Sequence, residues 1–200
     1  MKLKKLTVAI CMGLVMSVLM SFAGFDASCL ELKDNLLRLH IVANSNNEND
    51  QAIKLKVRDK LLEVGDKAFK DTENLILAKE TANEMLPVFK AAASEVIKQE
   101  GYNYSVNVTL GKAFFDTRVY DSFTLPAGEY DALKVVIGEG KGKNWWCVIF
   151  PSVCIPSASN KELGSVISNN TEKIANNAPK YKIKFKVVEW FETIKNGLYK

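Results

Sequence analysis

The stretch that most constrains the fold of this chain is LPAGEYDALKVVIGEGKGKNWWCVIFPSVC, residues 125–154. Within it, residues 130–137 place aliphatic side chains alternately on one side, which predicts a β-strand. Residues 145–150 are apolar at every position, which is typical of a strand covered on both faces. Because a short glycine-rich segment joins the two, we predict a hairpin and expect neighbouring strands to pair antiparallel.

Further strands are predicted on both sides of helical sequence. Residues 104–110 alternate between apolar and polar side chains, and Gly111-Lys112 predicts a turn into a second strand over residues 114–120. An apolar run at residues 36–42, interrupted by Arg38 and His40, predicts a strand that leads into a polar turn.

Two segments have helical periodicity. In residues 50–64, apolar residues recur at spacings of four and three, and we expect a helix capped near Asn49 or Asp50 that ends at Gly65. Residues 72–99 carry one long apolar stripe, interrupted at Pro87, where proline must kink or divide the helix.

These patterns predict an α+β fold with a predominantly antiparallel sheet of about four to five strands and two or three helices packed on one face. We assign this domain to residues 30–156 and expect a polar linker over residues 157–179. Residues 180–200 form a basic tail, in which alternation over residues 180–188 predicts a lysine-lined edge strand. Contact of this tail with a membrane surface is an alternative.

The N-terminus has the pattern of an export signal. A lysine-bearing start precedes an uncharged run from Leu6 to Phe25, and Ser21 and Ala23 have the spacing of a cleavage site. Cleavage after Ala23 is the prediction, and an uncleaved membrane anchor within residues 1–28 is the alternative. Either way, we expect the folded part to lie outside the cytoplasm.

Export changes how the cysteines are interpreted, because disulfides persist in oxidising compartments. Cys147 and Cys154 lie close enough in sequence to pair across the bend at Pro151. A metal or redox pair is the alternative, but the chain has no CxxC motif. The formal net charge of +4 is too small for a nucleic-acid-binding surface.

Two motifs remain open to a chemical interpretation. The segment GEGKGKN, residues 138–144, resembles an anion-binding loop, in which its glycines would let backbone N–H groups approach an anion and Lys141 or Lys143 would add positive charge. A strand follows it, however, and we interpret it as a hairpin turn. His40 is the single histidine, so any triad or histidine-rich metal site would need it. We predict that it is structural and expect no catalytic residues, metal or cofactor.

The residues LRLHIVANSNNENDQAIKLKVRDKLL (37–62), the 125–154 stretch and KFKVVEWF (184–191) together resemble the stage II sporulation protein R family of endospore-forming Firmicutes. The resemblance implies an exported signalling protein made in the forespore. It implies action across the intermembrane space on a membrane-embedded aspartic protease of the mother cell, which then processes the precursor of sigma factor E. It does not imply that the chain is itself a protease.

The resemblance supplies no catalytic residues, so its matching positions are candidates for a recognition surface. They are His40, Asn44, Ser45, Gly138, Gly140, Lys143, Trp145, Trp146, Cys147 and Cys154. Trp145 and Trp146 point to opposite faces of a regular strand, so that one can be exposed as a partner anchor. An exported cell-wall hydrolase that uses His40 with a nearby acid or thiol is the alternative function.

Overall fold

The computed structural model describes residues 2–120, 123–151, 164, 167–176 and 178–198, and the chain forms two compact units. The sheet unit comprises Lys33–Phe115 and Glu129–Ser168, and the terminal unit comprises Met1–Leu32, Asp116–Gly128 and Asn169–Lys200. The domain boundaries predicted at residues 28, 156 and 179 stay predictions.

The sheet unit is built on four strands, β1 (Leu37–Val42), β2 (Val106–Phe115), β5 (Gly128–Ile137) and β6 (Asn144–Phe150). Their order across the sheet is β2-β5-β1-β6. Strand β1 runs parallel to β5, with Leu39 opposite Leu133, and antiparallel to β6, with Leu39 opposite Cys147. The sheet is therefore mixed, and the prediction of a predominantly antiparallel sheet was wrong.

The predicted hairpin between β5 and β6 was also wrong, because β1 lies between these two strands. Strands that follow each other closely along the chain usually pair directly, and that tendency supported the prediction. Here the connecting residues 138–143 instead cross the end of β1. We call this segment the glycine strap.

Strand β2 also differs from the prediction of a hairpin turn at Gly111 and Lys112. It continues without interruption through Gly111 and Lys112, where a turn was predicted. A tight hairpin turn requires a positive φ angle, and Gly111 is not among the residues that have one. After β2, the short strands β3 (Arg118–Val119) and β4 (Thr124–Leu125) pair antiparallel within the terminal unit.

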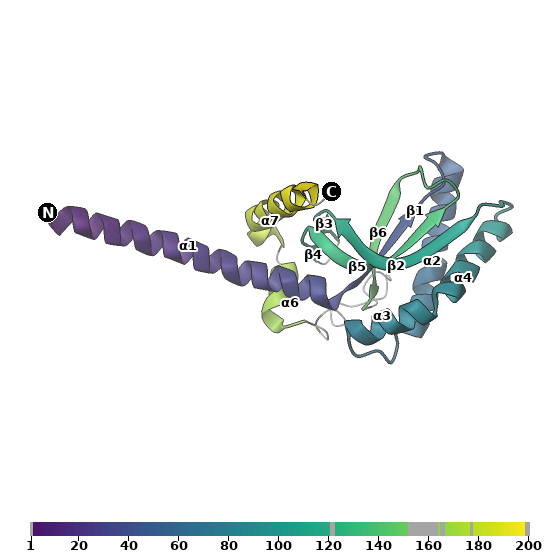
Figure 1. Ribbon diagram of the computed structural model, residues 1–200, viewed down its shortest axis with the longest axis horizontal. Coiled ribbons are helices and arrows are strands. Elements are labelled where there is room, and N and C mark those ends of the chain that lie inside the picture. Colours follow the sequence, from purple (N-terminus) through teal and green to yellow (C-terminus); the bar gives the residue numbers. More distant parts are fainter. Residues whose placement is uncertain (1, 121–122, 152–163, 165–166, 177, 199–200) are drawn as a thin grey trace. The chain divides into compact units, whose positions relative to one another are not determined.

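Three helices, α2 (Glu48–Ala68), α3 (Leu75–Glu84) and α4 (Leu86–Gln99), cover one face of this sheet, as Figure 1 shows. Pro87 lies in the first turn of α4 and confirms the predicted division of the second helical segment. The core between helices and sheet contains Leu37, Leu39, Ile41, Ile53, Val57, Leu61, Phe89, Ala93, Ile97, Leu133, Val135 and Ile137.

Helix α2 is longer than predicted at both ends. Asn47 caps its start by accepting a hydrogen bond from the Asp50 amide at 2.7 Å. At the other end the helix passes through Gly65 to Ala68. A Cβ atom on Gly65 would lie 2.7 Å from Cγ1 of Ile149, so this glycine permits close packing of α2 on β6 and does not end the helix.

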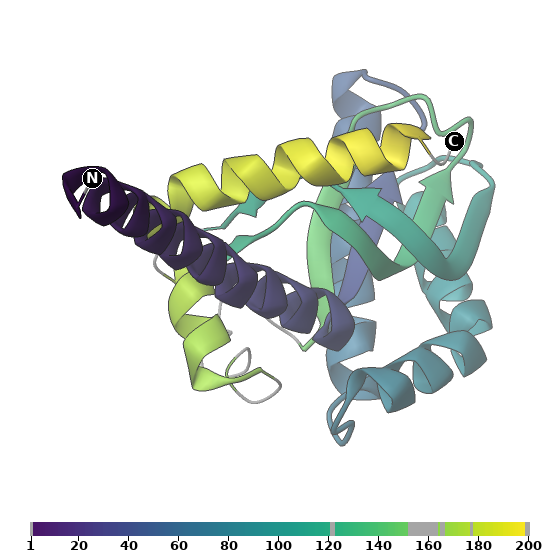
Figure 2. The same ribbon diagram turned by 60° about the vertical axis from the view of Figure 1, so that its left-hand side comes forward.

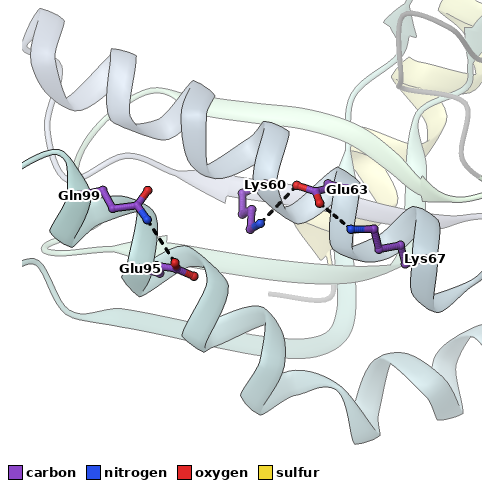
Figure 3. Close-up of polar contacts among 5 residues, drawn as sticks. All are labelled: Lys60, Glu63, Lys67, Glu95 and Gln99. Atoms are coloured by element: carbon purple, nitrogen blue, oxygen red, sulfur yellow. Dashed lines mark hydrogen bonds and ion pairs between the residues drawn. The ribbon is translucent and has the colours of Figure 1, made fainter.

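The outer surfaces of α2 and α4 carry contacts within single helices (Figure 3). In α2, Glu63 accepts hydrogen bonds from Lys60 at 3.3 Å and from Lys67 at 2.6 Å, and in α4 Gln99 donates to Glu95 at 3.1 Å. Because these pairs are exposed, water screens them and each contributes little to helix stability. We therefore assign them to helix stability and solubility.

The terminal unit holds α1 (Lys2–Asn35), β3, β4, α6 (Asn169–Asn176) and α7 (Ala178–Leu198). With these, the described residues form six helices, more than the two or three predicted. Helix α6 falls within the stretch predicted to be a polar linker. Its Thr171 is buried and donates to the Glu31 carboxylate of α1.

Residues 180–188 belong to α7 (Figure 2), so the predicted edge strand was wrong. The apolar residues there alternate as in a strand, yet Tyr181, Phe185 and Val188 also recur at the helical spacing of four and three. In the helix these three side chains pack against Phe25 and Cys29 of α1. Contact with α1 thus favours the helical period over the strand-like alternation, and the helix continues to Leu198.

Among the described residues, one helix is long and apolar enough to cross a membrane by length and composition. It is α1, near the N-terminus, and its most apolar window is not buried in the molecule. Such a helix fits the predicted signal peptide and also its alternative, a membrane anchor.

Candidate recognition face

The two tryptophans of β6 lie on opposite faces of the sheet, as predicted for a regular strand. Trp145 packs against the core under the helices, and the Arg58 guanidinium lies 4.4 Å from its ring centroid. Trp146 lies on the other face, beside the side chains of alternate β1 residues. Only Trp146 is therefore on the sheet face that α2, α3 and α4 do not cover.

Trp146 is held in place by His40. The two rings stack with centroids 3.8 Å apart and an interplanar angle of 17°, and Phe115 meets the Trp146 ring edge-on at 4.8 Å. His40 Nε2 lies 2.8 Å from Oδ1 of Asn144. Because an amide oxygen only accepts, Nε2 carries the proton and donates it.

The environment of His40 favours its neutral form. Burial lowers the pKa of the imidazole and outweighs the hydrogen bond to Asn144, which acts in the opposite direction, and the nearby Lys134 ammonium lowers the pKa further. Its hydrogen-bond partner is an amide and neither an acid nor a thiol. These contacts suit a support for Trp146 and do not favour a general base of a hydrolase.

A buried arginine underlies the same face. Arg38 is fully buried, and its Nε donates to the Cys147 carbonyl oxygen at 2.9 Å. Its guanidinium carbon lies 4.2 Å from the ring centroid of Phe115 and 4.8 Å from that of Tyr130. Cation–π contacts of this kind offset part of the cost of burying the charge. Arg38 was not predicted as a site residue, although its alternation with His40 places both side chains on one face of the strand.

The accessible part of this face is small and polar at its edge. Lys134 lies opposite His40, and Val136 and Asn144 lie opposite Val42 on either side of β1. Directly opposite residues share a sheet face. Lys134 and Asn144 are exposed, and Val136 and Trp146 are half-buried. We call these four residues the recognition face. Lys134, Val136 and Asn144 were not predicted as site residues.

The other predicted site residues meet at the C-terminal end of β1, where the glycine strap crosses it. The strap amides of Lys141 and Gly142 donate to the carbonyl oxygens of Asn44 and Ala43 at 3.1 and 2.9 Å. The Asn44 side chain accepts from the Glu139 amide at 2.9 Å. Asn44 thus acts as a structural bridge between β1 and the strap.

Three positions of the strap are glycines because a side chain at these positions would not fit. Gly138 and Gly140 have φ angles of +56° and +63°, which other residues rarely adopt. A Cβ atom on Gly138 would lie 2.2 Å from Asn44 Oδ1, and one on Gly142 would lie 2.2 Å from the Ser45 carbonyl oxygen. These close approaches to the protein's own backbone and side chains account for the glycines without a bound anion.

Asp50 completes this junction at the start of α2. Its Oδ2 accepts from Nδ2 of Asn44 at 2.8 Å and from Nδ2 of Asn47 at 3.2 Å, and the residue is 2% exposed. Burial alone would raise the pKa of this carboxyl group. Hydrogen bonding from Ser45, Asn44 and Tyr104 outweighs burial and holds the pKa below its usual value.

A buried lysine ties the strap to α2. Lys54 Nζ donates to Oε1 of Gln51 at 2.6 Å and to the Lys143 carbonyl oxygen at 3.1 Å. Burial lowers the pKa of Lys54, and the positive charges of Lys143 and Arg58 lower it further. Lys143 therefore contributes its backbone to this junction, while its side chain is exposed.

The cysteines are described in part. Cys147 is disulfide-bonded, whereas Cys11 and Cys29 are reduced thiols. The predicted partner Cys154 lies outside the described residues, so the Cys147–Cys154 pairing stays a prediction. In the described part of the chain, no group of three or more His, Cys, Asp or Glu side chains is placed to hold a metal ion.

The fold and this face define an α+β domain that follows an apolar N-terminal helix and presents a tryptophan supported from behind by a neutral histidine. The chain belongs to the stage II sporulation protein R family, whose model matches residues 33–160. It is 38% identical over 131 residues to stage II sporulation protein R of Bacillus subtilis. The aligned residues cover 66% of this chain and 58% of that relative. The alignment thus spans a little over half of the relative. No solved structure matches the chain.

Proposed function

We propose that this protein is an exported sporulation signal that activates a membrane-embedded aspartic protease of the neighbouring cell, which then processes the precursor of sigma factor E. Membership of the stage II sporulation protein R family supports a role in sporulation. The apolar helix α1 fits an export signal or an anchor. The domain acts as a ligand that favours the active state of the protease through higher affinity for that state.

The observation that carries the proposal is the recognition face. A half-buried tryptophan, fixed by stacking on His40, loses little conformational entropy on binding and is the type of residue that anchors protein interfaces. Lys134 adds a positive charge at the edge, which suits a partner surface carrying an acidic group. The partner contact is thus assigned to the face opposite α2, α3 and α4.

A matched pair of charge reversals tests this assignment. Lys134→Glu changes an exposed lysine on the recognition face, and Lys98→Glu changes an exposed lysine on α4. Each variant replaces the native gene of a sporulating strain, and immunoblotting follows conversion of the sigma factor E precursor. We expect Lys134→Glu to slow conversion about tenfold or more, since a misplaced charge at an interface costs several kcal/mol, and Lys98→Glu to leave it unchanged.

Two results would contradict the proposal at different levels. Normal precursor conversion in a strain that lacks the gene would exclude the signalling role itself. Equal conversion by both charge variants, at equal protein levels, would exclude the recognition face as the contact surface.

A further inference from the structure

The outer side of α7 carries an exposed apolar stripe that the recognition face does not involve. Its members recur at spacings of four, three, one and three, so they share one side of the helix. They are Ile183, Val187, Trp190, Phe191 and Ile194. Ile183 is 78% exposed, Trp190 70% and Phe191 63%. Soluble proteins rarely leave so many large apolar side chains together in water, and such patches mark interaction sites.

The opposite side of α7 is already occupied. Phe185 packs edge-on against Phe25 of α1 with ring centroids 5.0 Å apart, and Tyr181 stacks on the same ring at 5.8 Å. Val188 belongs to the same buried cluster. Helix α7 therefore has two apolar sides, of which the inner one is satisfied within the terminal unit and the outer one faces away from it.

The charges beside the stripe are mostly positive. By helical geometry, Lys182 and Lys186 lie beyond one edge of the stripe and Lys195 beyond the other, while Glu192 falls on the packed side. Glu189 lies beside Lys182 and pairs with Lys186 at 2.7 Å. Helix α7 contains five lysines and two glutamates, and so has a net positive charge. An apolar side with tryptophan and phenylalanine, bordered by lysines, is the pattern of a helix that lies in the surface of an anionic membrane.

The site where α7 packs on α1 agrees with this pattern. The uncharged run of α1 ends at Phe25, and at about 1.5 Å rise per residue its roughly 20 residues match the thickness of a bilayer core. Helix α7 contacts this end of the run, because Lys184 Nζ donates to the Ser21 carbonyl oxygen at 3.0 Å and Phe25 lies against Phe185. While α1 lies in a membrane, α7 is therefore at the level of the lipid headgroups.

We propose that α7 is an interfacial helix that binds an anionic bilayer surface, with the stripe immersed among the acyl chains and the lysines at the headgroups. This role is separate from the proposed signalling contact, because α7 lies outside the residues that match the family model and shares no residue with the recognition face. Membrane binding by α7 would hold the terminal unit at the bilayer surface.

The test uses Trp190 as its reporter in the full chain, reconstituted through α1 into vesicles of brominated phosphatidylcholine with or without phosphatidylglycerol. Subtracting the emission of Trp190→Phe isolates the Trp190 signal from those of Trp145 and Trp146. We expect bromine quenching and a shift to shorter wavelengths in the anionic vesicles. Quenching should weaken in high salt, where lysine attraction is screened.

Matched variants separate the stripe and the lysines from general effects on the chain. Ile183→Ser removes a stripe residue, and Ile76→Ser removes an equally exposed isoleucine of α3. Lys182→Glu reverses a flanking lysine, and Lys90→Glu reverses an exposed lysine of α4. We expect the two α7 variants to lose most of the Trp190 quenching and the two controls to retain it, with equal helix content by circular dichroism.

Two outcomes would overturn the proposal. One is a Trp190 signal that aqueous acrylamide quenches equally in anionic vesicles and in detergent. The other is shielding of Trp190 that depends on protein concentration and not on phosphatidylglycerol, which would assign the stripe to a second copy of the chain. Neither result would change the outcome expected for Lys134→Glu. Membrane binding by α7 and partner binding by the recognition face can therefore be refuted independently.

Discussion

Asp50 shows how a single buried carboxylate can hold a junction of three segments together. It accepts from the side chains of Asn44, before α2, and Asn47, at the α2 cap, while Asn44 bridges to the glycine strap. Asn44 and Ser45 were predicted as site residues, whereas Asp50 was predicted only as a helix cap. The role of Asp50 in this junction could not be predicted, because no local pattern in the sequence indicates that the glycine strap, residues 138–143, crosses this turn.

Replacing Asp50 by Asn is expected to reduce the free energy of unfolding by about 1–3 kcal/mol at neutral pH, because the hydrogen bonds from Ser45, Asn44 and Tyr104 favour a charged carboxylate and a neutral amide has only one accepting oxygen. The pKa of Asp50 is lower in the folded protein than in the unfolded chain, so its charge stabilises the fold above the unfolded value of about 4. That contribution disappears as the pH falls through the folded pKa. The difference between the two proteins should therefore shrink toward about pH 3.

Urea unfolding followed by circular dichroism at both pH values measures this effect. Asp66→Asn is the control, because Asp66 is exposed on the same helix. An equal loss for both variants, or a loss at Asp50 that does not change with pH, would refute the role assigned to Asp50.

At the scale of elements, the sequence predicted the helices and strand faces better than their connections. Each of α2, α3, α4, β2 and β5 buries one side in the core. Burial on one side produces a periodic pattern of apolar residues, and that pattern can be detected in the sequence. The order β5-β1-β6 depends on a strand from far away in the chain, so no pattern within residues 125–154 could reveal it. Similarly, the two periods of residues 180–188 were distinguishable only by the packing of Phe185 on Phe25.

The glycine strap gives a test of this strand order. Gly142→Ala should lower the free energy of unfolding by about 1–3 kcal/mol, because the new Cβ atom would lie 2.2 Å from the Ser45 carbonyl oxygen. Gly111→Ala should be neutral or slightly stabilising, since its new Cβ atom would meet no other side chain or backbone atom within 4 Å. In a simple β5–β6 hairpin, residue 142 would not approach Ser45, so equal stability of both variants in urea would contradict the observed crossing.

At the scale of the whole molecule, the two units have separate cores and should respond separately to core mutations. Phe25→Ala removes the ring that Tyr181 and Phe185 contact, at an expected cost of about 3–5 kcal/mol to the terminal unit. Hydrogen–deuterium exchange should rise in residues 178–198 and stay unchanged in α2 and α4. Leu14→Ala, at a 63% exposed position of the same helix, is the control. Faster exchange throughout both units would show that they unfold as one.

The position of β1 between β5 and β6 has a consequence for the route by which the protein reaches its fold. Leu37 pairs with Asp131 and with Phe150, so each sheet partner of β1 lies roughly a hundred residues further along the chain. In a chain that crosses a membrane N-terminus first, β1 emerges long before either partner. The sheet cannot close until residue 150 has followed, because β6 pairs directly with β1. In a chain exported as proposed, this strand order would delay closure of the sheet until most of the chain had crossed the membrane.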